Sequence, residues 1–205
     1  MTGKEPVDSI NAEPCERMQD EPGLIRRARS GDVQAFELLV RHYQQRVLAL
    51  ACSIVDNPAD ARDVAQEVFI RVYRFLPSFN LRKRFFTWLY RIVVNCSYDF
   101  LKREKRFRHD PLDEAVIDAA VEPGEKRIRD SGELSETISG LLGTLSAPQK
   151  TAFILRDVEG LSCKETAAVM NCPSGTVRSH LHFARRRLRD LLKDNYPEFL
   201  EGIVP

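Results

Sequence analysis

The sequence predicts an all-α protein with two small helical domains joined by a flexible acidic linker, the C-terminal domain containing a helix-turn-helix. Three observations support this fold class. Apolar residues recur every three to four positions over most of the chain, no segment shows a convincing two-residue strand period, and a polar, acidic stretch interrupts the helical pattern near the middle. With 205 residues, 43% of them hydrophobic, the chain can form two small cores.

Residues 1–23 are predicted to form a flexible acidic tail, because they hold three prolines, six acidic and two basic side chains, and no apolar period. The first domain covers residues 24–105. Its first long helix begins after Asp32, a candidate N-cap, and carries an apolar stripe as far as Ile54.

The Asp56-Asn57-Pro58 turn places a proline where a second helix can begin, and this helix extends to about Phe75. After a loop around Pro77, a third long helix spans about residues 84–105. Residues 106–132 are polar and acidic and contain prolines, so they are predicted to form the linker.

The second domain covers residues 133–195, and residues 196–205 form a C-terminal tail. Ser146 and Gln149 make a capping-box pattern, which opens a helix that stops at Gly160.

Two further helices follow with a tight turn between them. Ser162 and Glu165 form another capping-box pattern, Asn171-Cys172-Pro173 ends the short helix, and Ser174 is a candidate N-cap for the next one. The last helix carries an apolar stripe of Val177, Leu181, Ala184, Leu188 and Leu191. Its opposite side holds Arg178, Ser179, His182, Arg185, Arg186 and Arg189. This layout predicts a helix-turn-helix whose second helix enters the DNA major groove; an ordinary charged surface helix is the alternative.

The net charge of +1 hides a strong segregation of charge along the chain. Residues 82–108 have a net charge of +7, residues 109–136 of −6, and residues 174–195 of +4. Two basic blocks separated by an acidic one fit two nucleic-acid-facing surfaces joined by a segment that does not bind.

One helix face in the first domain combines carboxylates with an amide. Asp60, Asp63 and Glu67 are three and four residues apart, and Gln66 lies at the edge of the same face. For Asp60 alone, a favourable charge at a helix N-terminus is a sufficient explanation. The complete face favours a surface for a protein partner.

The third helix presents cations and aromatic rings along one side, at Arg84, Trp88, Arg91, Asn95, Tyr98 and Lys102. The core side is expected to hold Phe85, Leu89, Ile92, Val93, Cys96 and Phe100. Such a face can neutralise phosphates and stack exposed bases, which suits single-stranded DNA. A core position is the alternative for Trp88, and the adjoining Arg82-Lys83-Arg84 loop favours the binding interpretation.

The five cysteines are scattered and form no C-x-x-C pair: Cys15, Cys52, Cys96, Cys163 and Cys172. Cys52 and Cys96 lie in apolar patterns and are expected in the core. Cys163, Cys172, His180 and His182 fit no standard zinc spacing, so no metal site is expected.

No catalytic residues are expected either, because the sequence lacks a nucleophile motif, a glycine-rich phosphate loop and paired carboxylates in a basic segment. No cofactor is expected. The sequence shows neither a signal peptide nor an apolar run of membrane-spanning length, which predicts a cytoplasmic protein with reduced thiols and no direct membrane insertion.

Three blocks in this order resemble the extracytoplasmic-function (ECF) type sigma factors, the compact class of bacterial transcription initiation factor. They are DARDVAQEVF at residues 60–69, FFTWLYRIVVN at 85–95, and the long block at 145–188 that ends in the arginine-rich helix. The resemblance extends from about Leu24 to Leu192.

The resemblance implies a non-enzymatic protein that binds core RNA polymerase and directs it to promoter DNA. Polymerase binding would fall on Asp60, Asp63, Gln66 and Glu67. Recognition and melting of the −10 element would fall on Arg82, Lys83, Arg84, Trp88, Arg91 and Asn95. Reading of the −35 element would fall on Ser174, Thr176, Arg178, Ser179, His182, Arg185 and Arg186.

The resemblance further implies control by an anti-sigma factor and a regulon for stress, envelope or redox responses. A conventional dimeric helix-turn-helix transcription regulator is the alternative, with residues 24–105 as its dimerisation domain. The side of the third helix that carries cations and aromatic rings argues against this alternative, because such a side does not fit a dimer core.

Overall fold

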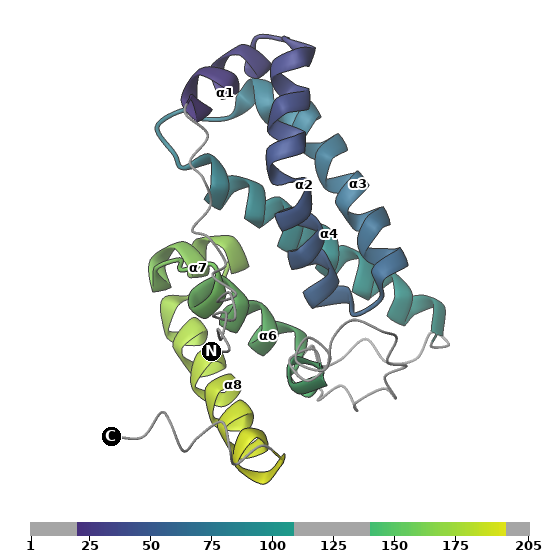
Figure 1. The fold of residues 1–205 in the computed structure, drawn as a ribbon, viewed down its shortest axis with the longest axis vertical. Coiled ribbons are helices and arrows are strands. Elements are labelled where there is room, and N and C mark those ends of the chain that lie inside the picture. Colours follow the sequence, from purple (N-terminus) through teal and green to yellow (C-terminus); the bar gives the residue numbers. More distant parts are fainter. Residues whose placement is uncertain (1–19, 109–139, 196–205) are drawn as a thin grey trace, which may run out of the picture.

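The computed structural model describes residues 20–108 and 140–195, and all regular structure within these ranges is helical. The N-terminal unit contains α1 (Glu21–Arg29), α2 (Val33–Val55), α3 (Pro58–Phe75), a short 3₁₀ turn (Leu76–Ser78) and α4 (Phe85–Arg108). The C-terminal unit contains α6 (Ala147–Phe153), a π-helical segment (Ile154–Val158), α7 (Cys163–Met170) and α8 (Ser174–Asn195). The predicted all-α fold with two helical units is confirmed (Figure 1). Most of the predicted linker and of both tails lies outside the described residues.

Local capping signals set the helix starts of the N-terminal unit. Asp32 caps α2 as predicted, its side chain accepting the Ala35 N–H at 3.0 Å. Asn57 accepts the Ala59 N–H at 2.9 Å, and Pro58 then opens α3. The Asn57 contact confirms the predicted turn between α2 and α3.

The flexible tail predicted for residues 1–23 extends too far, because residues 21–23 belong to α1. Asp20 caps this helix by accepting the Gly23 N–H at 3.1 Å, and Pro22 fits the first turn, where a missing N–H costs nothing. At the other end of the unit, α4 continues to Arg108 and so extends past the predicted domain end at residue 105.

Capping boxes also set the helix starts of the C-terminal unit. The Ser146 N–H donates to the Gln149 side chain at 3.3 Å, and the Ser162 N–H donates to Glu165 at 2.9 Å. Gly160 then leaves the helical path with a φ of 70°, a left-handed conformation that glycine adopts readily.

One predicted cap is wrong. Ser174 is the first residue of α8 rather than its N-cap. The first helical hydrogen bond runs from the Val177 N–H to the Pro173 carbonyl at 3.2 Å, so the chain already enters the helix at the proline.

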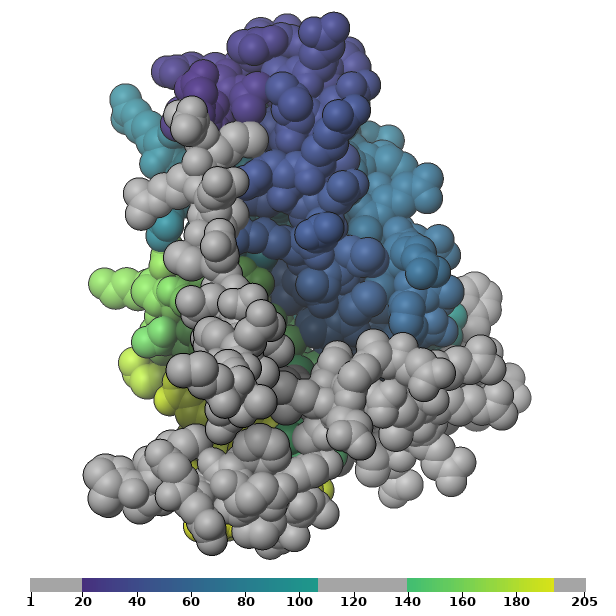
Figure 2. All heavy atoms as spheres, in the orientation of Figure 1, coloured from purple at the N-terminus to yellow at the C-terminus, as the bar shows by residue number. Residues whose placement is uncertain are grey.

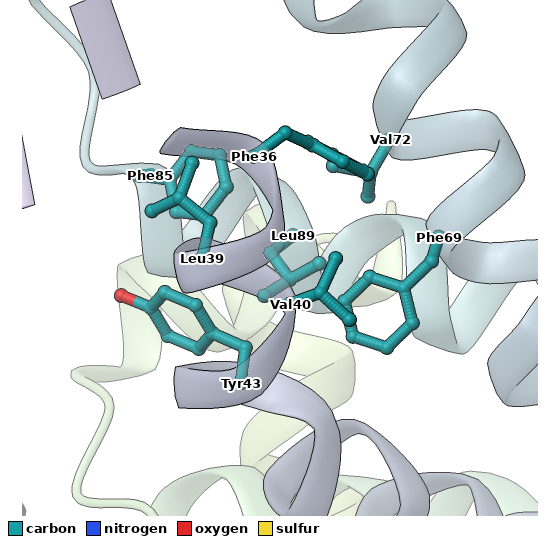
Figure 3. A pocket seen from close by; sticks show the side chains of 8 residues that line it. All are labelled: Phe36, Leu39, Val40, Tyr43, Phe69, Val72, Phe85 and Leu89. Carbon is teal, nitrogen blue, oxygen red and sulfur yellow. The ribbon is translucent and has the colours of Figure 1, made fainter. Parts of the chain in front are cut away.

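The core of the N-terminal unit lies where α2, α3 and α4 meet. Figure 3 shows eight side chains that converge there: Phe36, Leu39, Val40, Tyr43, Phe69, Val72, Phe85 and Leu89. The crevice between them leaves no room for a water molecule, so it is a packed core rather than a ligand site.

The same core continues into the C-terminal unit. Leu155, Leu161 and Val169 belong to one buried cluster with side chains of α2 and α4, and α4 packs against α7 while α2 packs against α6. In Figure 2 the purple-to-teal unit rests on the green and yellow one. None of the described helices has the length and apolar composition that crossing a bilayer requires.

Tyr90 of α4 lies in this shared core and gives a test of it. Its hydroxyl is buried and has no partner at hydrogen-bond geometry among the described residues, and burial together with the nearby Glu159 carboxylate raises its pKa. Tyr90→Phe is therefore expected to leave the free energy of unfolding unchanged or to raise it by up to about 1 kcal/mol in urea denaturation, since an unpaired buried hydroxyl is removed.

Tyr43→Phe is the matched control. The Tyr43 hydroxyl donates to Glu21 at 2.6 Å, and losing this hydrogen bond is expected to cost about 1 kcal/mol. A larger loss in Tyr90→Phe than in Tyr43→Phe would show that the Tyr90 hydroxyl has a strong partner in solution.

Candidate nucleic-acid interface

The acidic and amide side chains of α3 lie on one side of the helix. Asp63 and Gln66 are exposed, and Asp60 and Glu67 are half-buried. Glu67 accepts a hydrogen bond from Arg71 at 2.7 Å, and this bond is the main cause of the raised Arg71 pKa. Arg71 also reaches Asp99 of α4 at 3.3 Å. Asp63 and Gln66 are therefore the members of this face most accessible to a partner.

Two apolar side chains that the sequence analysis did not single out continue the same ridge of α3. Ile70 is 46% exposed and Tyr73 is 53% exposed, and they follow Asp63 and Gln66 at helical spacing. The Tyr73 ring packs edge-on against Phe36 of α2, with centroids 5.0 Å apart. The ridge thus combines polar groups with exposed apolar ones, which is the usual make-up of a protein-binding surface.

The basic loop before α4 is held by a tight turn. The Asn80 side chain accepts the Arg82 N–H at 2.9 Å, and the Asn80 carbonyl accepts the Lys83 N–H at 2.9 Å. This turn leaves Arg82, Lys83 and Arg84 exposed at one corner of the unit.

Trp88 combines features of the two positions considered for it, a core position and a DNA-facing position. It is half-buried and packs against Phe79 and Phe85, with ring centroids 4.9 and 5.5 Å away. Phe79 and Phe85 are buried, so Trp88 is the partly exposed member of a rigid aromatic cluster beside the basic loop. A fixed ring with one open side suits stacking on a base.

The exposed strip of α4 continues from this cluster toward the C-terminal unit. The Arg84 guanidinium, on a 76% exposed side chain, contacts the Glu165 carboxylate at 2.5 Å, and the Arg91 guanidinium donates to the Asn171 side chain at 3.3 Å. Asn95 is exposed on the same strip. Tyr98, predicted for this strip, instead turns inward and donates to Thr151 of α6 at 3.1 Å.

A wide depression of about 460 Å³ lies beside the loop and was not found by sequence reasoning. It is lined by Arg26, Arg29 and Ser30 at the end of α1, together with Pro77 and Leu81. The arginine-rich sequence at the end of α1 could have indicated a basic surface here. These arginines extend the basic surface around residues 82–84.

The polar side of α8 is exposed as predicted. Arg178, Ser179, His182, Arg185 and Arg186 are exposed, while Ser174 and Thr176 are half-buried. Val177, Leu181 and Ala184 are buried against the rest of the unit. Exposed Phe183, beside His182, was not singled out in the sequence.

Arg185 is already engaged within its own unit. It forms a two-pronged contact with Asp157, at 2.9 and 2.5 Å, and this hydrogen bonding is the main cause of its raised pKa. Arg178 therefore has the more accessible guanidinium for a base edge.

Cys52, Cys96 and Cys172 are not arranged for reactivity. Cys96 is buried as expected, and burial raises the pKa of its thiol to about 11. Burial also raises the pKa of Cys52 and of Cys172, which are half-buried. Raised pKa values keep these thiols protonated, and protonated thiols are poor nucleophiles.

Family profiles match the chain in the order of its two units. The Sigma-70 region 2 profile matches residues 39–107, and the Sigma-70 region 4 profile matches residues 135–188.

Curated relatives match nearly end to end. The RNA polymerase sigma-H factor of Pseudomonas aeruginosa is 36% identical over 184 residues, which cover 85% of this chain and 95% of the relative. The ECF RNA polymerase sigma-E factor of Haemophilus influenzae is 36% identical over 190 residues, covering 87% and 98%.

Two solved structures share the fold. The sigma factor RpoE of Bartonella quintana, in complex with the anti-sigma factor NepR, gives a TM-score of 0.63 at 28% identity and covers 78% of this chain and 98% of its own. CnrH, in complex with the cytosolic domain of CnrY, gives 0.64 at 24% identity and covers 86% and 99%.

Glu165 provides a pH test of the contacts at the start of α7. Its pKa is lowered, first by the hydrogen bond from the Ser162 N–H, then by the Ser162 hydroxyl and the Arg84 guanidinium. A carboxylate with a lowered pKa stabilises the fold above its ordinary pKa of about 4.3, and this contribution is lost as the pH falls through the lowered value.

Glu165→Gln is therefore expected to be less stable than wild type at pH 7 in urea denaturation, with the difference disappearing at acidic pH. Glu37→Gln, an exposed site on α2, is the control and should give no such trend. A difference that stays constant down to pH 2 would contradict the role of the Glu165 charge.

Proposed function

The chain belongs to the extracytoplasmic-function class of the sigma-70 family, and from this premise we propose that it binds core RNA polymerase in the cytoplasm and directs it to promoters. The supporting observation is that two helical units, each with its own exposed candidate face, match the region 2 and region 4 profiles in order. It acts as a specificity subunit without catalysis. For a conventional dimeric regulator, we would expect only the second unit, with its helix-turn-helix, to match a sigma-70 profile. Here both units match one.

Core polymerase binds the ridge of α3. Asp63 and Gln66 supply accessible polar contacts, and Asp60 and Glu67 lie at their edge. Ile70 and Tyr73 add the apolar anchors that carry much of the affinity of a protein interface.

The −10 element binds the corner formed by the loop and the start of α4. Arg82, Lys83 and Arg84 neutralise the backbone phosphates of the melting strand, and Trp88 offers its open side to an unstacked base. Arg91 and Asn95 continue the path along α4.

The −35 element binds the first turns of α8 in the major groove. Arg178 suits bidentate contact with guanine, and Ser179 and His182 lie on the same exposed side. Ser174 and Thr176 at the helix start, with Arg185 and Arg186 further on, contact phosphates or neighbouring bases.

A protein of the anti-sigma kind controls the factor, in keeping with the solved relative that is bound to one. The regulon under this control serves a stress, envelope or redox response. Reconstitution tests the proposal: the purified chain should form a stable complex with core polymerase and permit initiation at a cognate promoter. A folded chain that forms no complex with core would overturn it.

Arg178→Ala is expected to reduce initiation at a cognate promoter about 5- to 150-fold, the range for a loss of about 1–3 kcal/mol at a base-contacting arginine. Binding to core polymerase should be unchanged. Lys193→Ala, an exposed cation near the end of α8, is the matched control and should have little effect. Equal loss of initiation and core binding in Arg178→Ala would indicate misfolding instead of lost DNA contact.

Asp63→Ala combined with Gln66→Ala is expected to weaken core binding by at least tenfold, because it removes the two accessible polar side chains of the α3 ridge. Affinity is measured by fluorescence titration of labelled protein with core polymerase. Asp190→Ala on α8 is the control for the lost carboxylate. Unchanged core affinity in the double variant would rule out this ridge as the main docking surface.

A further inference from the structure

Phe183 is an aromatic side chain left exposed on the polar side of α8. It is 54% exposed, whereas the other large apolar side chains described in this helix are buried or half-buried. Phe183 follows Ser179 by four residues, so the two lie on one side of the helix, away from the buried Val177 and Leu181. More than half of the Phe183 surface therefore adds nothing to the core and is accessible to a partner.

The Phe183 ring has a defined neighbour on this side. It meets the exposed His182 ring edge-on, with centroids 5.7 Å apart and ring planes at 72°. Edge-to-face contact is a preferred geometry for aromatic pairs, so it holds the Phe183 ring beside His182. Because His182 belongs to the side proposed to face the −35 element, Phe183 is presented to the same partner.

The first turn of α8 is open to close approach on this side. Gly175 lies eight residues before Phe183 and is exposed, and no other part of the described structure lies within 4 Å of the position that its Cβ would take. A glycine inside a helix is less stable than an alanine, and packing within the described chain does not require one here. Glycine is favoured where the backbone of another molecule must come close.

The side chains that surround Phe183 are mainly cationic. Arg186 and Arg187 follow it by one helical turn and are exposed. Asp190, one turn further on, reaches Arg186 only at 3.9 Å, and the Arg186 side chain stays 69% exposed. An apolar ring among free guanidinium groups calls for a partner that offers anionic groups around a small apolar one.

The major groove of DNA offers this combination. Its edges carry phosphates, which arginines neutralise, and its floor carries the C5-methyl group of each thymine. A phenyl ring on the groove floor can contact this methyl group. The amino or carbonyl group of another base would instead lose hydrogen bonds with water against the ring. Phe183 is therefore suited to select thymine.

We propose that Phe183 reads a thymine of the −35 element through contact between its ring and the C5-methyl group of the base. The proposal rests on the proposed function and deepens it. It gives α8 an apolar reader next to Arg178, which suits guanine, so that the two side chains select different bases.

Replacement of thymine by deoxyuridine tests this contact, because it removes only the C5-methyl group. Each thymine of the −35 element of a cognate promoter, on either strand, is replaced in turn. Initiation by holoenzyme assembled from core polymerase and the full chain is then measured. Wild type should lose about fourfold in initiation at one position, as expected for one methyl group taken out of contact.

Phe183→Ala removes the ring from an exposed site, and circular dichroism checks that the variant remains helical. It should initiate equally well on thymine and on deoxyuridine at that position, while its affinity for core polymerase stays at the wild-type value. Val158→Ala is the matched control, because Val158 is another exposed apolar residue of the same unit, 65% exposed and outside α8. It should keep the fourfold discrimination.

Three results would overturn the proposal. They are a −35 element in which no deoxyuridine affects wild type, full discrimination retained by Phe183→Ala, and a Phe183→Ala defect confined to core binding, which would assign the ring to a protein surface. Failure of wild-type holoenzyme to initiate on the unmodified promoter would overturn the proposed function instead.

Discussion

Helix α4 is buried along two adjacent sides, and the arrangement of every candidate binding face depends on this constraint. Phe85 and Leu89 pack against α2 and α3, while Tyr90 and Tyr98 turn toward the C-terminal unit. The remaining strip is exposed at Arg91 and Asn95. It carries the cations and polar groups proposed to meet DNA, and α7 lies along its edge.

The polar and charged side chains of the candidate faces divide into two kinds. Asp63, Gln66 and Arg178 are exposed. Arg84, Arg91 and Lys150 are held by contacts between the units. The first kind is accessible to a partner, whereas the second kind is already engaged by contacts between the units.

Local features of the fold could be predicted from the sequence because the physics behind them is local. Asp32, the Asn57-Pro58 turn and the Ser162–Glu165 capping box act over three or four residues, and the apolar stripe of α8 depends only on helical spacing. The predicted site residues of the 82–84 loop, and those of α8 from Arg178 onward, are exposed for the same reason. Ser174 was misplaced as a cap because the proline before it already begins the helix.

The contacts between the units could not be predicted from spacing. Lys150 and Asp56 are 94 positions apart, and nothing in either local sequence marks the pair. Ile70 and Tyr73 were missed because helical periodicity alone does not separate an exposed apolar residue from a core one. Tyr98 shares its helical spacing with the exposed strip, and only the packing of α6 shows that it turns inward.

The most direct test of the central claim is transcription in vitro on genomic DNA, with core polymerase from the same organism and with or without the purified chain. The account predicts start sites that depend on the chain and share two sequence elements about 25 base pairs apart. A folded chain that binds one duplex site as a homodimer, and adds no start sites to core polymerase, would contradict it.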